Sequence, residues 1–181
     1  MKPNELYEEI KKTQYTKSGD DVDWAVKVYD DEKIVRLLFE ESTTDRDWHN
    51  NFDFPVKIYK KQESCMKVAR GWSYGGAMSV LAAEDFHYRT HIKPYVITFG
   101  APKPLWGRKT WEYVKSCVSD AWQYAHVNDV VPLCVPLPGY RMIHKDKIGS
   151  GFCIFKLFRG DIYHCIYGDE SLYDNVRMSG I

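Results

Sequence analysis

A serine flanked by glycines is the first candidate for chemistry in this sequence. The stretch GWSYGGA, residues 71–77, places Ser73 two residues after Gly71 and two before Gly75, a G-x-S-x-G pattern. This pattern is typical of a nucleophilic serine at a sharp turn between a strand and a helix. Glycines suit such a turn because their backbones can approach neighbouring elements closely. The alternative interpretation is a glycine-flanked turn before an ordinary helix.

A nucleophile of this kind needs an acid and then a histidine later in the chain. Asp129 stands just beyond a predicted strand, residues 121–127, where open α/β sheets deliver functional side chains. Of the six histidines, only His144 and His164 follow it. His144 lies among apolar residues in GYRMIH, which favours a structural role. His164 follows a glycine-bounded apolar run and is expected in a loop or at a helix start, so it is the predicted base.

The elements that must position these residues alternate between helices and strands. A helix is predicted over residues 4–15 and two strands within 24–40. Beyond the serine, the expected elements are a helix from residue 77, a strand over 95–99, a helix over 110–118 and the strand over 121–127. This alternation predicts an α/β fold, a three-layer αβα sandwich with a mostly parallel central sheet.

One predicted strand has an unexpected composition. The segment CMKVARG, residues 65–71, should be the central strand that leads into Ser73. Central strands of parallel sheets are buried on both faces and are therefore mostly apolar. Lys67 and Arg70 do not fit that expectation.

The overall composition narrows the class of protein. The 181 residues fit one domain, residues 1–181, and 44% of them are apolar. Lys+Arg and Asp+Glu are equal at 25 each, so nothing favours a nucleic-acid partner. No apolar run reaches the roughly 18 residues of a transmembrane helix, and the charged N-terminus is unlike a signal peptide. The five cysteines lack CxxC spacing, which predicts free thiols in a cytoplasmic protein without a disulfide framework or metal site.

Five stretches together resemble the class 3 lipases, the fungal-lipase-like branch of the α/β-hydrolases. They occur in the order expected for that family, between about residues 33 and 170. They are VRLLFEESTTDRDWHNNFDF, GWSYGGAMSVLAAED, VITFGAPKP, YAHVNDVVPLCVP and PGYRMIH. In this order they are more specific than the serine motif alone.

The resemblance implies a role for each matched residue. It makes Ser73 the nucleophile, His164 the general base and then acid, and Asp129 the group that orients the imidazole. It places Ser42 in the oxyanion hole, with the backbone N–H of Tyr74 as the second donor. The implied reaction is hydrolysis of a lipid or small-molecule ester, without a cofactor or metal. A catalytically inactive hydrolase-fold binding module is the alternative, and an acyltransferase with the same triad is a third possibility.

Three departures from the family pattern stand out. Trp72 replaces the usual histidine before the serine, and Glu40-Glu41 replaces the usual Arg-Gly near the oxyanion position. The chain between Ser42 and Ser73 is also shortened. Its connecting segment, residues 55–66, is too short for both a crossover and a lid helix, because isolated helices need about 12–15 residues. We therefore predict an open cleft, and hydrolysis of dispersed short-chain esters without a rate jump at the solubility limit.

Overall fold

The computed structural model describes residues 2–16, 23–29, 34–40, 68–133, 139–153, 160–174 and 176. Its first half contains α1 (Pro3–Lys12), β1 (Trp24–Tyr29), β2 (Ile34–Phe39), β3 (Val68–Trp72), α3 (Ser73–Thr90) and β4 (Tyr95–Phe99). Its second half contains β5 (Leu105–Trp106), α4 (Arg108–Ser116), β6 (Asp120–His126), η1 (Val131–Leu133), β7 (Tyr140–Arg141), β8 (Asp146–Ile148), α5 (Gly160–His164) and η3 (Glu170–Tyr173). None of the described helices is both long enough and apolar enough to span a lipid bilayer.

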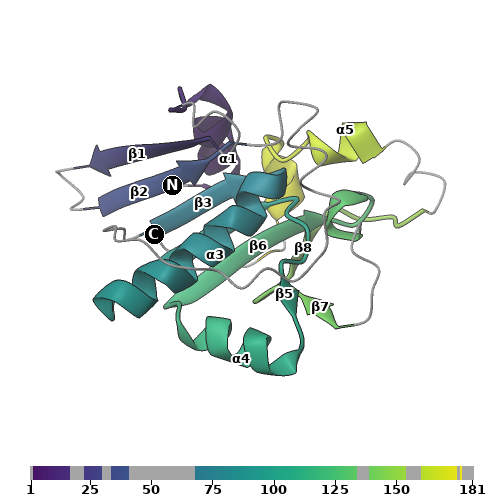
Figure 1. The fold of residues 1–181 in the computed structure, drawn as a ribbon. Helices are drawn as coiled ribbons and strands as arrows, with labels where there is room; N and C mark the ends of the chain where they lie inside the picture. The colour runs from purple at the N-terminus through teal and green to yellow at the C-terminus, as the bar shows by residue number, and fades with distance from the viewer. Residues whose placement is uncertain are drawn as a thin grey trace.

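The central sheet has six strands in the order β1-β2-β3-β4-β6-β8 (Figure 1). β1 pairs with β2 in the antiparallel sense, and every other neighbouring pair is parallel. β5 and β7 form a separate two-stranded antiparallel pair. The parallel strands β3, β4 and β6 lie side by side, so the residues that follow them meet at one edge of the sheet.

Helices cover both faces of this sheet. On one face, α3 and α4 pack against small and β-branched side chains of β3, β4 and β6, including Ala69, Val96 and Ala121. On the other face, α1 and η3 pack against larger aromatic side chains of the same strands, including Trp72 and Phe99. Alternate residues of each strand serve alternate faces. The predicted three-layer α/β architecture is confirmed.

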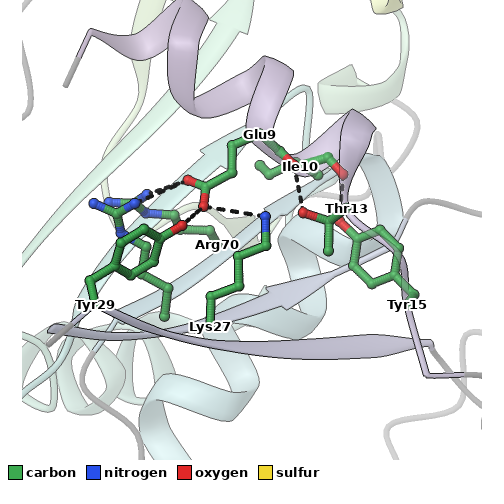
Figure 2. Close-up of polar contacts among 8 residues, drawn as sticks. Glu9, Ile10, Thr13, Tyr15, Lys27, Tyr29 and Arg70 are labelled. Atoms are coloured by element: carbon green, nitrogen blue, oxygen red, sulfur yellow. Dashed lines mark hydrogen bonds and ion pairs between the residues drawn. The ribbon is translucent and has the colours of Figure 1, made fainter.

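The arginine that does not fit an apolar central strand is paired with α1. Arg70 of β3 and Arg36 of β2 are fully buried, and each donates to Glu9 Oε2, at 3.3 and 3.2 Å. Lys27 Nζ lies 3.5 Å from Glu9 Oε1, and the Tyr29 hydroxyl donates to the same oxygen. Figure 2 shows the Glu9 carboxylate reaching down from α1 into this group. The Glu9 carboxylate of α1 therefore pairs with charged groups that β2 and β3 bury.

Several helix boundaries differ from the sequence predictions, among them those of α4, which spans Arg108–Ser116 instead of 110–118. The first helix ends at Lys12 instead of residue 15, because Thr13 Oγ1 and the Tyr15 hydroxyl bond to the carbonyls of Glu9 and Ile10 (Figure 2). The central helix begins at Ser73 instead of residue 77. The glycines after the serine are part of that helix. The shortened segment between Ser42 and the strand before Ser73, and with it the lid prediction, lies outside the described residues.

Candidate active site

Ser73 occupies a strained turn between β3 and α3. The strand ends at Trp72 and the helix begins at the serine itself, whose φ is 55°. A positive φ is uncommon for a residue with a Cβ and is typical of functional turns. The flanking glycines are needed for space. A Cβ on Gly71 would lie 2.2 Å from the carbonyl oxygen of Gly75, and one on Gly75 would lie 2.3 Å from that of Glu40.

His164 and Asp129 meet at the same edge of the sheet. Asp129 follows β6 in a turn, in which its N–H donates to the carbonyl of His126, and its side chain is fully buried. His164 ends the short helix α5 and is 8% exposed. Its Nδ1 lies 2.9 Å from Asp129 Oδ2. A carboxylate can only accept, so Nδ1 carries the proton and Nε2 presents its lone pair. This is the arrangement that a general base requires.

Tyr167 is a second side-chain donor to the same aspartate. Its hydroxyl lies 2.6 Å from Asp129 Oδ2 and accepts from the N–H of His126 at 3.0 Å. Burial, and then the Asp129 charge, raise the pKa of Tyr167 well above its usual value, so the hydroxyl stays protonated as a donor. The sequence prediction missed this residue. Its contact with Asp129 spans 38 positions of the chain, and no local sequence pattern marks it.

Gly100 provides the space in which this pair lies. It follows β4 with a φ of +54°, and a Cβ there would lie 2.7 Å from Asp129 Oδ2 and 2.8 Å from His164 Nδ1. Any larger residue would therefore displace the imidazole or the carboxylate. In the sequence, Gly100 is one residue of the VITFGAPKP block, and nothing there predicts this role. The end of β4 thus contributes to the site through the absence of a side chain.

The expected hydrogen bond between Ser73 and His164 is not formed. His164 Nε2 is buried and has no hydrogen-bond partner among the described residues. Such bonds are often long without substrate and tighten only when the substrate is bound. The expected contact of the base with the aspartate is present, whereas its expected contact with the serine is absent here.

Of the two predicted oxyanion donors, Tyr74 lies within the described residues. Tyr74 is the second residue of α3, so its backbone N–H belongs to the first turn, where N–H groups point out of the helix end. Ser42 lies outside the described residues. The carbonyl of Glu40, just after β2, packs directly against Gly75, so the last described residue before Ser42 lies beside the turn.

The alternative histidine lies elsewhere. His144 is exposed, and its Nε2 lies 3.3 Å from Asp146 Oδ1 instead of near Asp129. A cavity of about 830 Å³ also lies away from Ser73, around the far ends of α3 and α4. Its lining residues are His87, Tyr88, Arg89, Thr90, His91, Tyr113, Ser116 and Cys117. Within the described part of the chain, no cluster of His, Cys, Asp or Glu could hold a metal ion.

Comparison with known proteins identifies the fold and the family resemblance. Residues 57–138, which include the serine turn and Asp129, match the family described as lipase (class 3). The resemblance to the class 3 lipases is confirmed. A comparison with curated protein sequences gives no significant match.

Solved structures, two lipases among them, share the fold of this chain. The Rhizomucor miehei lipase in its propeptide complex has a TM-score of 0.60 at 19% identity, covering 76% of this chain. The Lip2 lipase of Yarrowia lipolytica has a TM-score of 0.63 at 14% identity, covering 86%. The MDLA protein of Penicillium cyclopium has a TM-score of 0.57 at 19% identity, covering 77%. The chain spans 56%, 79% and 64% of these three chains, respectively.

Proposed function

We propose that this protein is a serine carboxylester hydrolase of the class 3 lipase type, acting through Ser73, His164 and Asp129 and an acyl-enzyme. The observation that carries the proposal is the buried hydrogen bond from His164 to Asp129. It occurs at the sheet edge where Ser73 begins α3 with a positive φ. A glycine-flanked turn without a catalytic role gives no reason for this strain, which costs on the order of 1–3 kcal/mol.

The proposed reaction begins with attack of Ser73 Oγ on the ester carbonyl carbon, while His164 Nε2 takes the hydroxyl proton. The imidazolium that forms is stabilised by Asp129, whose carboxylate also accepts from Tyr167 and, through Oδ1, from the N–H of Val131. The oxyanion accepts hydrogen bonds from the Tyr74 N–H and from a donor at or near Ser42. Collapse breaks the ester C–O bond, and the alcohol leaves with the proton from His164. Water then repeats the sequence and releases the carboxylate.

The test is covalent labelling with a fluorophosphonate, which reacts with activated serines. The wild-type protein should gain one probe mass on Ser73 and hydrolyse p-nitrophenyl esters. Ser73→Ala should lose both signals. Ser116→Ala, which removes an exposed serine of α4, is the matched control and should keep both. A folded wild-type protein that is neither labelled nor active would favour the inactive binding module, with which the missing Ser73–His164 hydrogen bond is also consistent.

The substrate class rests on the shortened segment before β3. We propose dispersed short-chain esters, because twelve residues leave little chain for a lid over a long acyl groove. A panel of p-nitrophenyl esters should show falling kcat/KM with acyl length and no rate jump at the solubility limit. A jump at that limit, or a preference for emulsified triacylglycerol, would contradict this substrate class. Product analysis in the presence of an added alcohol separates hydrolysis from acyl transfer.

A further inference from the structure

Two aromatic side chains hold consecutive carbonyl groups next to the proposed base. Trp72 Nε1 donates to the backbone oxygen of His164 at 3.0 Å. The Tyr7 hydroxyl donates to the backbone oxygen of Cys165 at 3.3 Å. The donors come from β3 and from α1, whereas the acceptors lie more than ninety positions further along the chain than Trp72. Two separate elements therefore converge on one short piece of backbone.

The two donors also pack against one another and against the imidazole. The rings of Tyr7 and Trp72 meet edge to face, with centroids 5.2 Å apart. The Trp72 ring lies 5.4 Å from the His164 ring, tilted by 36°. Tyr7 further contacts Phe99, just before Gly100, and Tyr167, the second donor to Asp129. The Tyr7 and Trp72 side chains are both buried, so these contacts belong to the core.

The backbone at this position needs such support. α5 has five residues and ends at His164, and the last carbonyls of any helix have no partner within it. Trp72 supplies one of the missing donors, and Tyr7 donates to the next carbonyl, that of Cys165 just beyond the helix. Two single bonds separate the His164 backbone from its imidazole ring, so a shift of the backbone moves Nε2 directly. Catalytic rates are sensitive to such shifts, because a catalytic group misplaced by about 1 Å can lower the rate by about 100-fold.

Each donor is itself fixed. Trp72 is covalently attached to Ser73, so its indole links the proposed nucleophile to the backbone of the proposed base. Tyr7 lies on α1 between Leu6 and Ile10, which are buried against the sheet, and near Glu9, which the Arg36 and Arg70 guanidinium groups hold. The His164 backbone is thus held in place by β3, which also positions Ser73, and by α1, which packs on the same sheet.

We propose that Trp72 and Tyr7 are positioning residues that hold the backbone of His164 and Cys165, and so aim Nε2 at Ser73. The inference rests on the proposed function for its catalytic consequence. It gives a specific role to Trp72, which stands where the class 3 lipases usually carry a histidine.

The test uses variants that remove one donor each. Trp72→Phe keeps an apolar ring without the N–H, and Tyr7→Phe removes only the hydroxyl. Trp111→Phe and Tyr15→Phe are the matched controls, because Trp111 and Tyr15 also donate to backbone carbonyls, of Met142 and Ile10. The double variant, Trp72→Phe with Tyr7→Phe, completes a double-mutant cycle that measures the coupling between the two donors.

A lost hydrogen bond of ordinary strength corresponds to roughly a threefold to tenfold effect. We expect each donor variant to lower kcat for a p-nitrophenyl ester by that factor with KM nearly unchanged, and to slow fluorophosphonate labelling of Ser73 equally. The controls should stay within about twofold of the wild type. A merely structural role would lower the melting temperature of all four variants and leave kcat of the folded fraction unchanged, which would overturn the proposal.

Hydrogen exchange of the peptide that spans residues 160–168 supplies a readout that needs no activity. Amide exchange there should be faster in both donor variants and unchanged in both controls. If the wild-type protein leaves Ser73 unlabelled, the proposed function fails, and the exchange measurement alone decides whether the two side chains hold this segment. Unchanged exchange in both donor variants would contradict the proposal whatever the activity.

Discussion

At the scale of single residues, the candidate site depends on positions that lack a side chain as much as on those that carry chemistry. Asp129 accepts from His164, Tyr167 and the Val131 amide, so its charge is compensated by three donors within a buried site. Charge-assisted hydrogen bonds of this kind contribute about 1.5–3 kcal/mol each. They form only because Gly100 leaves the space in which the carboxylate and the imidazole meet. The site therefore requires the glycine at position 100 as much as it requires the side chains that donate to Asp129.

Gly100→Ala should inactivate the protein for a steric reason. The added Cβ would press on both His164 and Asp129, and a displacement of about 1 Å costs roughly 100-fold in rate. Gly107→Ala is the matched control, because Gly107 also has a positive φ, +79°, but a Cβ added there would have no neighbour within 4 Å. The left-handed backbone should cost each variant on the order of 1–2 kcal/mol in urea unfolding, and Gly100→Ala should lose more because its Cβ also strains the buried His164–Asp129 pair. Equal kcat/KM values for the two variants would contradict the steric role of Gly100.

The sequence locates the residues that react better than those that support them. Ser73 is marked by its flanking glycines, and chain order leaves His144 and His164 as candidate partners. Tyr167 carries no such mark, because its role depends on a contact across 38 positions that no local pattern encodes. The missing Ser73–His164 hydrogen bond depends on the exact placement of two side chains, which a motif does not specify.

At the scale of elements, α1 acts as the cover of the sheet face that supports the site. Its apolar side chains Leu6, Tyr7 and Ile10 enter the core, and Glu9 enters a cluster of buried cations from β2 and β3. Arg70 did not fit an apolar central strand because its partner Glu9 lies 61 positions away, whereas Lys67 lies outside the described residues. A pattern of alternating burial predicts strands, but it does not reveal which distant carboxylate will neutralise a buried arginine.

Glu9→Ala should strongly destabilise the fold. Removing one partner from a buried ion pair leaves charge without compensation and costs about 3–5 kcal/mol. Glu112→Ala is the control, because Glu112 pairs with Arg108 on an exposed helix face, and such pairs contribute about 0.3–0.5 kcal/mol. The free energy of unfolding in urea measures both. A loss below about 1 kcal/mol for Glu9→Ala would show that the buried guanidinium groups do not depend on this carboxylate.

At the scale of the whole molecule, the tyrosines beneath the site couple stability to pH. Burial, followed by the charge of Asp129, raises the pKa of Tyr167, and burial likewise raises the pKa of Tyr173 above its usual value. The two residues are linked, since the Tyr173 hydroxyl donates to the backbone carbonyl of Tyr167 at 2.8 Å. Both therefore stay protonated in the folded protein at a pH where the unfolded chain has lost these protons. This difference in bound protons makes folding less favourable in alkaline solution.

Below about pH 10 these two tyrosines should not change how the free energy of unfolding depends on pH. Above about pH 10 they should make it fall. The folded state holds more protons there, so each phenol should lower the free energy of unfolding by about 1.4 kcal/mol per pH unit, up to its own raised pKa. Urea unfolding between about pH 8 and pH 11 measures the slope. Tyr173→Phe removes one contribution and should make the slope shallower by about that amount, whereas Tyr88→Phe changes an exposed ring and should leave it as in the wild type. Parallel slopes for the wild type and Tyr173→Phe would mean that the Tyr173 phenol ionises equally in both states, and that its burial beneath the site does not hold its proton.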